Sequence, residues 1–405
     1  MSSWTPMRWP EGWREPALLD LLKGTAVDYL LIAKGTEFSA VRARAQQLGM
    51  EVGEPGVAPK GVEIVAGAWP GVQWSAGHGS GPTGAPWVDS NGWAIRLNRA
   101  LHPDAMPWVD APPAPKTFVV ADSYLIAIAD SAAHGGRWIV SLDAPLARGL
   151  AAGNASSLAI WKRLTATAGF FAARKSWLDY VPVGVAGVLS DFTGDNEYFG
   201  RELLNLMDRA GLHYRILPKD RISVGSFEGL RALSYTDATP PSPDLRRQVL
   251  AFVDNGGLLV ASPKWGEVTG PAADSPQLAG YKVRAVGKGR IAISDDDPAD
   301  PYTWAAGAAV LVSHRYDLVR FWNSGAACSF YTVTPDRKQA VVHLLFYAGR
   351  GPDSATVRIA GQYRAARAST VDSPTVDKVA VVPQGDGVEV RLPQVSQYVA
   401  VELDV

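Results

Sequence analysis

The segment with the densest set of reactive and ligand-binding side chains is Trp69–Asp89, which reads WPGVQWSAGHGSGPTGAPWVD. It brings together indole rings, an imidazole, a carboxylate and an amide; the candidate substrate-binding residues are Trp69, Trp74, His78, Trp87, Asn91 and Trp93. Aromatic faces suit the C–H surfaces of a sugar, and carboxylates or amides suit its hydroxyls. The pattern is typical of a carbohydrate-binding loop, and equally of a lid whose rings pack inward.

His78 lies between glycines in the run GHGSG. Glycine allows the backbone to come close to a ligand. The run nevertheless lacks the Lys-Ser/Thr ending of a phosphate-binding loop and does not lead directly into a helix. A flexible turn is therefore favoured over a phosphate site.

Cleavage of a glycosidic bond usually needs two carboxyl groups, one to protonate the leaving oxygen and one to attack or to activate water. Four acids stand near the ends of predicted strands: Glu54, Asp89, Asp110 and Asp143. We predict Asp89 and Asp143 as the catalytic pair, with Glu54 and Asp110 contacting substrate. The alternative for Asp143, which is favoured because Pro145 follows it, is that it caps the next helix. Asp89 has the same alternative, and Asp110 is also a turn-starting residue.

The elements that would position these residues alternate between strand and helix over residues 1–180. Predicted strands include 28–32, 50–54, 62–68 and 137–143, and a helical stretch over 144–177 has a possible break near Gly153. Strands alternating with helices predict parallel βα units. About six strands fit in this length, whereas a complete eight-unit barrel needs roughly 250 residues. The prediction is an incomplete or shortened (β/α) barrel.

Two further parts follow. Residues 181–275 have the order β-α-β-β-α-β, typical of a small flavodoxin-like α/β domain. Residues 276–405 contain short strands separated by Gly, Pro and Asp, which predicts an antiparallel β-sandwich. The acids of the loop Asp191–Glu197 could bind a cation, but their place at a helix start favours an interaction with the helix dipole.

Composition narrows the choice of partners. The formal net charge is −1, so the chain has no long-range attraction for nucleic acid. No apolar run is long enough to span a membrane. The single cysteine, Cys328, excludes an internal disulfide and a cysteine metal site, and no HExxH motif occurs. We expect no cofactor and no metal. The compartment is cytoplasmic as the sequence stands, or extracellular if an export signal has been removed.

The order of the three parts resembles that of the family-42 β-galactosidases and related glycoside hydrolases. The middle part carries GVAGVLSDFTGDNEYFGRELLNLMDRAGLHYRILPKD followed by QVLAFVDNGGLLVAS, and the tail carries VVHLLFYAGR, ATVRIAGQYRAARAS and GVEVRLPQVSQYVAVELDV. The resemblance implies a class-I amidotransferase-like middle domain and a homotrimer. The only Asn-Glu pair, Asn196-Glu197, starts a helix outside the front part, so the family's acid/base role is not carried onto it. Cys328 lies outside the middle part, so amidotransferase chemistry is not predicted.

Two functions follow as alternatives. The first is a glycoside hydrolase acting on an oligo- or polysaccharide through a carboxylate pair in a Trp-rich cleft. The second is a non-catalytic carbohydrate-binding or structural protein on a degenerate hydrolase scaffold, favoured by the short barrel and the displaced Asn-Glu pair. A third interpretation is an assembly protein whose middle domain mainly forms the oligomer.

Overall fold

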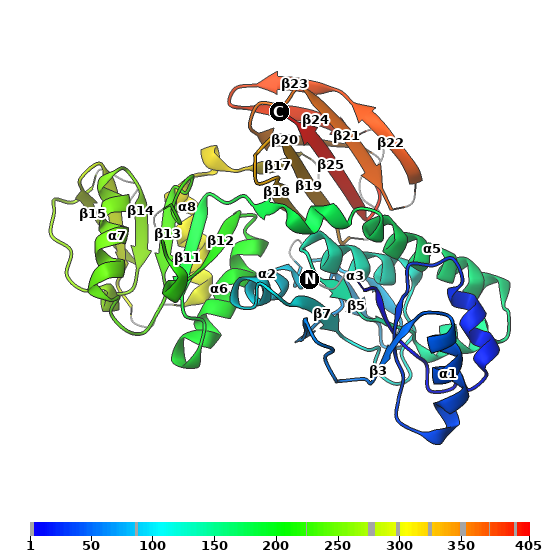
Figure 1. The fold of residues 1–405 in the computed structure, drawn as a ribbon. Helices are drawn as coiled ribbons and strands as arrows, with labels where there is room; N and C mark the ends of the chain where they lie inside the picture. The colour runs from blue at the N-terminus through cyan, green and yellow to red at the C-terminus, as the bar shows by residue number, and fades with distance from the viewer. Residues whose placement is uncertain are drawn as a thin grey trace.

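The computed structural model describes residues 4–85, 88–223, 225–273, 280–296, 300–322, 326–348, 354–371, 373–392 and 395–405. Figure 1 shows three groups of elements, coloured blue to teal, green to yellow, and orange to red along the chain. The first two groups contain parallel sheets and the last is built from antiparallel strands. The predicted mixed α/β architecture with an antiparallel C-terminal part is confirmed.

The front group is a curved set of parallel strands. The strand order runs β3-β2-β1-β9 in one sheet and β8-β7-β4 in the other. Between β8 and β9 the chain passes through Ile139, whose amide bonds the carbonyl of Val109 on β7. The strands are β1 (Pro6–Arg8), β2 (Tyr29–Leu31), β3 (Glu51–Gly53), β4 (Val62–Ala66), β7 (Met106–Asp110), β8 (Arg137–Trp138) and β9 (Val140–Ser141). The helices around them are α1 (Ser39–Gln47), α2 (Gly92–Leu101), α3 (Ala121–Ala133), α4 (Ala144–Ala151) and α5 (Ala155–Ala172).

Alternation along these short strands decides which side chains face inward. Tyr29, Trp108 and Ile139 pack together inside the curve of the strands. Met7 and Val140 belong to the separate cluster under the surrounding helices. Successive strand residues point to opposite faces. Met7 and Val140 face the surrounding helices, so the residues that follow each of them, Arg8 and Ser141, face the inside at the carboxyl ends of β1 and β9.

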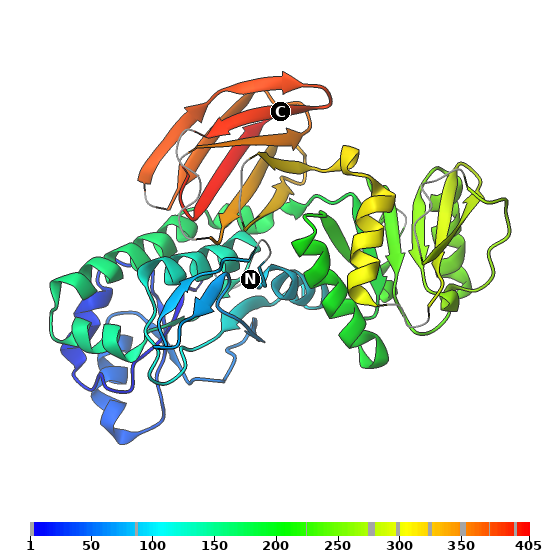
Figure 2. The ribbon, with the colours of Figure 1, turned by 180° about the vertical axis from the view of Figure 1, so that it is seen from behind.

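The middle group is a six-stranded sheet in the order β12-β11-β13-β14-β16-β15, parallel except for β15. Its strands are β11 (Ala186–Ser190), β12 (Tyr214–Pro218), β13 (Ala232–Tyr235), β14 (Leu258–Ala261), β15 (Tyr281–Val286) and β16 (Gly289–Ser294). Its helices are α6 (Glu197–Arg209), α7 (Pro243–Asp254) and α8 (Pro301–Val312), and Figure 2 shows α8 in yellow lying along this sheet. The sheet extends past residue 275 because β16 joins β14 in parallel, an addition that short strands separated by glycine do not reveal.

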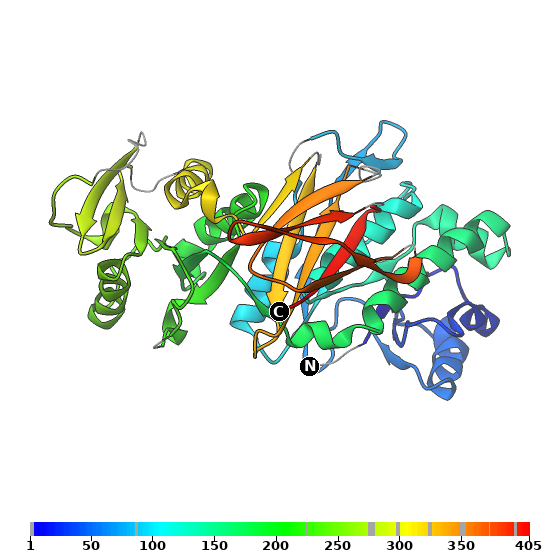
Figure 3. The same ribbon diagram turned by 90° about the horizontal axis from the view of Figure 1, so that it is seen from above.

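The tail is made of two facing antiparallel sheets with an apolar layer between them, built from residues such as Val342, Val357 and Val401. The strands are β10 (Val181–Pro182), β17 (Val319–Trp322), β18 (Ala327–Val333), β19 (Gln339–Phe346), β20 (Ala355–Ala360), β21 (Ala365–Thr370), β22 (Ser373–Val379), β23 (Val381–Gln384), β24 (Gly387–Leu392) and β25 (Tyr398–Asp404). Strand β10, which leads from the front group, pairs with β18. Seen from above in Figure 3, the tail lies over the centre of the molecule.

Local signals in the sequence agree with several elements. The helical stretch after residue 143 does break at Gly153, between α4 and α5. The long loop after Trp69 contains a small hairpin of β5 (Val72–Trp74) and β6 (Ser80–Pro82). Among the described residues, no helix has the length and apolar character needed to cross a membrane.

Candidate functional site

The carboxyl ends of the front strands carry a polar cluster centred on Arg8. One guanidinium nitrogen of Arg8 donates to both carboxylate oxygens of Asp110 at 2.7 Å. The Nε of Arg8 lies 3.3 Å from the hydroxyl of Ser141. Both side chains of the ion pair are mostly buried, with 24% and 19% exposure. Parallel strands place their binding groups at this end.

Two adjoining cavities open at this cluster, and we call them together the mouth. One has a volume of about 630 Å³ and the other about 370 Å³. Arg8, Trp9 and Glu11 line both of them. The smaller cavity is also lined by Lys34 and Glu54, which form an ion pair at 3.1 Å. Of the predicted residues, Glu54 lines the mouth, and Asp110 contacts it through Arg8 without lining either cavity.

Asp143 lines the larger cavity, but its carboxylate is occupied by the protein itself. It accepts hydrogen bonds from the amide of Leu146 at 3.0 Å, the amide of Val119 at 3.2 Å and the hydroxyl of Tyr124 at 2.9 Å. It caps α4 and is 4% exposed. Burial and the neighbouring carboxylate raise the pKa of Tyr124 well above its ordinary value. The side chain thus fills the capping role weighed in the sequence analysis.

Asp89 lies elsewhere. Its carboxylate contacts the guanidinium of Arg209 and accepts a hydrogen bond from Asn205 at 3.2 Å, both on α6 of the middle group. It is not among the residues lining either cavity of the mouth. The structure does not bring Asp89 and Asp143 to a shared cavity there, because one is tied to α6 and the other to α4.

Asn91 is a structural clamp. Its side chain exchanges hydrogen bonds with the backbone of Ala68 at 2.9 and 3.0 Å and donates to Asp130 at 3.1 Å. The fully buried Asp130 also accepts from the hydroxyl of Tyr347 on the tail at 2.7 Å. Burial raises the pKa of Asp130 to about 6 despite these bonds. The amide of Asn91 is therefore consumed in joining the front group to the tail.

The tryptophans of the front part differ in what they pack against and in how exposed they are. Trp69 is half-buried and packs edge-on against Tyr124 and Trp138, at centroid distances of 5.2 and 5.0 Å. Trp93 packs against the core of the middle group. Trp74, on the hairpin, is 39% exposed. Trp69 therefore packs inward, as the lid interpretation expects. Trp87 lies outside the described residues.

His78 occupies a turn of the hairpin with a φ of 60°, and its side chain is exposed. The amide of His78 bonds the carbonyl of Ser75 at 2.9 Å. A left-handed conformation is uncommon for a residue with a side chain and is typical of tight turns. The flexible-turn interpretation of GHGSG agrees with this geometry.

The loop after β11 is held by its own ion pairs. Asp191 lies 2.6 Å from the ammonium of Lys219, which also contacts the buried Asp237. These contacts raise the pKa of Lys219 above its ordinary value. Among the described residues no cluster of three or more His, Cys, Asp or Glu side chains could hold a metal ion.

Sequence reasoning missed the residue at the centre of the mouth. Arg8 precedes the first predicted element, and its three-residue strand is too short for a period-2 pattern to be recognised. The partner, Asp110, is 102 residues away in the sequence. The only available signal was the charged residue inside the apolar run around Met7 and Trp9.

Comparison with known proteins adds to this geometry. No protein-family model matches the sequence, and no curated protein matches it. Among solved structures, α-L-fucosidase isoenzyme 2 from Paenibacillus thiaminolyticus overlays with a TM-score of 0.53 at 11% identity, covering 98% of this chain and 83% of that one. The fold is glycoside hydrolase-like.

Two more distant structures also overlay. The rhamnosidase from Novosphingobium sp. PP1Y gives a TM-score of 0.48 at 11% identity, covering 93% of this chain and 37% of that one. Gan42B, a GH42 β-galactosidase from G. stearothermophilus, gives 0.46 at 10% identity, covering 91% and 66%. This chain therefore spans less than two thirds of each of these two enzymes.

Proposed function

We propose that this chain binds a neutral carbohydrate in the mouth at the carboxyl ends of β1, β7 and β9. The observation that carries the proposal is Arg8, which lines the cavity together with Ser141 and is held in place by its ion pair with Asp110. A paired guanidinium and carboxylate present both donors and acceptors while adding no net charge. Sugar hydroxyls donate and accept together, so they match such a surface.

The scaffold supports the ligand class. One overlay with a TM-score above 0.5 is with a protein named as an α-L-fucosidase. Fold likeness alone does not carry function from one protein to another. It raises the expectation that a cavity at the strand ends takes a sugar, and the charge pairing at the mouth supports the same ligand independently.

The finer architecture belongs to this proposal. We interpret the front strands as an incomplete barrel, open between β3 and β4, which end the two sheets. We interpret the parallel middle sheet as an amidotransferase-like domain and the chain as a trimer. The division into 1–180, 181–275 and 276–405 is proposed with its second boundary moved to about residue 312, because α8 packs against the middle core.

Binding is tested first on a glycan array and then by titration calorimetry with the strongest glycan. Arg8→Gln removes the guanidinium and should weaken affinity by about tenfold or more, because charged hydrogen bonds contribute about 1.5–3 kcal/mol. Arg8→Lys keeps the charge and should give an intermediate loss. Arg14→Gln, which changes a side chain that is 59% exposed, is the matched control.

Circular dichroism must show that the Arg8 variants are folded. If the wild-type chain binds no glycan on the array, or if folded Arg8→Gln binds as tightly as wild type, the mouth is not a carbohydrate site.

Hydrolysis is a second candidate function, favoured by one observation. Glu11 and Glu54 line the same cavity of about 370 Å³, and two carboxyl groups are what glycosidic cleavage needs. Assay of the wild type against a panel of aryl glycosides decides between the two. Release of the aryl group that is abolished in Glu11→Gln and in Glu54→Gln would establish hydrolysis there. No release from a glycan that binds would leave binding as the function.

A further inference from the structure

A third cavity lies at the opposite, amino end of the front strands. It has a volume of about 500 Å³ and is enclosed by all three groups of elements. Arg137, at the start of β8, lines it, and so does Leu178, which packs against the interior cluster of the front strands. The exposed side chains of Lys175 and Asp179 form part of its rim, so the cavity reaches solvent.

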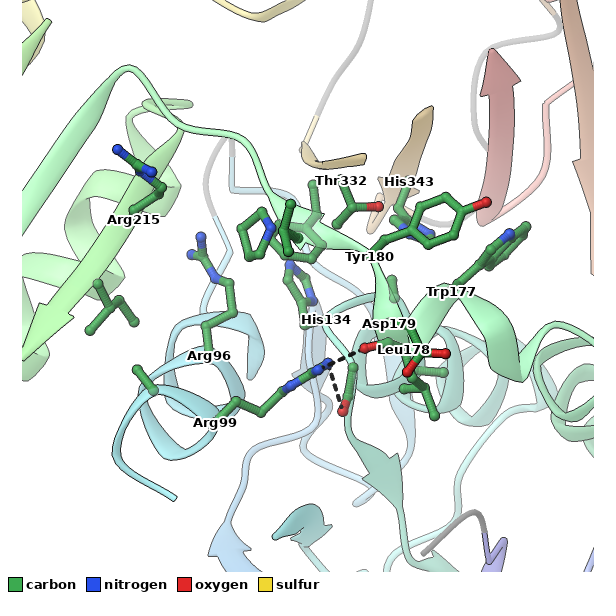
Figure 4. Close-up of a pocket in the computed structure, with 18 of the residues that line it drawn as sticks. Arg96, Arg99, His134, Trp177, Leu178, Asp179, Tyr180, Arg215, Thr332 and His343 are labelled. Carbon is green, nitrogen blue, oxygen red and sulfur yellow. Dashed lines mark hydrogen bonds between the residues drawn. The ribbon is translucent and has the colours of Figure 1, made fainter. Parts of the chain in front are cut away.

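Figure 4 shows how the walls are assembled. Arg96 and Arg99 extend from α2 on one side, and Trp177 and Tyr180 stand on the other side, after α5. His343 comes from β19 of the tail. The elements that meet here are far apart in the sequence, so the cavity exists only in the assembled molecule.

The lining is strongly cationic. It contains six basic side chains and, among the described residues, one acid, Asp179. Arg96 is neutralised by Asp208. In the described part of the chain, the other five make no ion pair; they are Arg99, Arg137, Arg174, Lys175 and Arg215. The lining of this cavity therefore carries an excess of positive charge although the whole chain has a net charge of −1.

Backbone carbonyls hold several of these cations in place. Arg99 donates to the carbonyl of Leu178 at 2.8 Å, and Arg137 donates to that of Gly136 at 2.9 Å. Arg215 donates to the carbonyl of Glu228 at 2.7 Å, while its Nε is buried and has no hydrogen-bond partner among the described residues. Carbonyls orient a guanidinium but supply no compensating charge.

Burial without an ion pair is unfavourable for a cation. It lowers the pKa of Arg137 to about 10, and it also lowers the pKa values of Arg99 and Arg215. Arg137 still carries its charge at neutral pH. An anion entering the cavity would gain guanidinium partners that are already desolvated and positioned.

The rest of the lining is aromatic and uncharged. Phe171, Trp177 and Phe330 line the cavity, and the guanidinium of Arg174 lies 5.5 Å from the centroid of the Trp177 ring. Burial lowers the pKa values of His134 and His343 to about 3, so both imidazoles are neutral near pH 7. A ligand with an anionic group and a flat or ring-shaped apolar body would meet both kinds of surface.

We propose that this cavity binds a small organic anion that carries a phosphate or sulfate group on a ring. A guanidinium presents parallel N–H groups that match two oxygens of such a group. The volume suits a single small molecule. The site is separate from the mouth, so the proposal holds or fails independently of carbohydrate binding there.

Titration calorimetry at low salt with four probes tests the proposal: 1-naphthyl phosphate, glucose 6-phosphate, inorganic phosphate and uncharged glucose. We expect the ring-bearing phosphates to bind more tightly than inorganic phosphate. Glucose should give no binding that competes with 1-naphthyl phosphate. Tighter binding of 1-naphthyl phosphate than of glucose 6-phosphate would identify the aromatic wall as the contact for the ring.

Three substitutions connect the binding to this cavity. Arg174→Gln and Arg215→Gln should each weaken binding of 1-naphthyl phosphate by about tenfold, the effect of losing one charged hydrogen-bonding partner. Lys175→Gln, on the exposed rim, should weaken it by about two- to threefold and leave folding intact. Arg247→Gln removes the same charge from a side chain that is 74% exposed on α7 and should have no effect.

The proposal fails if the folded wild type binds none of the phosphates. It also fails if Arg174→Gln, Arg215→Gln and Lys175→Gln all bind 1-naphthyl phosphate as tightly as wild type does. Thermal melting of each variant separates loss of binding from loss of fold, and Lys175→Gln supplies the answer if the two arginine variants unfold.

Discussion

The two ends of the front strands are both lined by charged side chains, yet the charges are arranged differently. At the carboxyl end Arg8 is matched with Asp110, and Lys34 with Glu54. At the amino end five basic side chains line one cavity without an ion pair in the described chain. Matched pairs suit a neutral, hydroxyl-rich ligand, whereas unmatched cations suit an anion. The other charged residues that line the larger cavity of the mouth are of both signs: Glu11, Asp143, Lys116 and Arg148. The balance of acidic and basic side chains therefore separates the two ends more clearly than the cavity sizes do.

The largest expected effect is acid instability centred on the amino end. Burial lowers the pKa values of His134 and His343 to about 3 and that of His213 to about 4. The unfolded chain therefore binds more protons than the folded chain below about pH 6.5, and stability falls as pH drops. Burial raises the pKa of Asp130 to about 6 and also raises the pKa values of Asp28 and Asp208, so these carboxyl groups act in the opposite direction. The histidine shifts are the larger, so between pH 6 and 4 we expect a net loss of stability of about 1 to 3 kcal/mol per pH unit.

Urea unfolding at pH 7, 6, 5 and 4 measures this slope. His343→Asn removes one of the three imidazoles and should make the slope shallower by about one proton. His314→Asn, which changes an imidazole that is 71% exposed, is the control and should leave it unchanged. A free energy of unfolding that stays constant from pH 6 to 4 would contradict the assignment of buried neutral histidines to this end.

The next effect concerns Asp143, which lines the mouth but is bonded to the protein. Asp143→Ala leaves the amide of Val119 and the hydroxyl of Tyr124 without an acceptor and uncaps α4. We expect a loss of about 3 kcal/mol in the free energy of unfolding, measured in urea. Asp122→Ala, on an aspartate that is 42% exposed, should cost less than about 1 kcal/mol. If Asp143→Ala is as stable as wild type but no longer binds glycan, Asp143 contacts the ligand and its capping role is not needed for stability.

The smallest effect is also the sharpest test of the comparison. Raising NaCl from about 0.05 to 0.5 M shortens the Debye length severalfold. Binding of 1-naphthyl phosphate should weaken by about tenfold, and glycan binding by less than about twofold, because salt screens the charge of the phosphate whereas a neutral glycan has no charge to be screened. Equal salt dependence of the two affinities, measured by calorimetry on one preparation, would remove the electrostatic distinction between the two ends.

Predictions from local pattern were strongest where a few neighbouring residues determine the structure. The break at Gly153 and the strand predicted over 62–68 follow from short-range signals, and the structure has a helix break at Gly153 and a strand over Val62–Ala66. The capping alternative for Asp143 rested on the proline two residues later. Asp110 and Glu54 were predicted from their positions near strand ends; Glu54 lines the mouth, and Asp110 is paired with Arg8, which lines it.

The sequence by itself determined the class of fold, because the periods of strands and helices are encoded within each element. Only the tertiary structure decided which side chains meet. Asp89 forms an ion pair with a residue of α6, Asn91 donates a hydrogen bond to the buried Asp130, and Arg8 pairs with Asp110. These partners are joined by the curvature of the sheets and by the docking of the three groups, and no local pattern records that geometry. Both cavities arise at such long-range junctions, so neither could be read from composition or spacing.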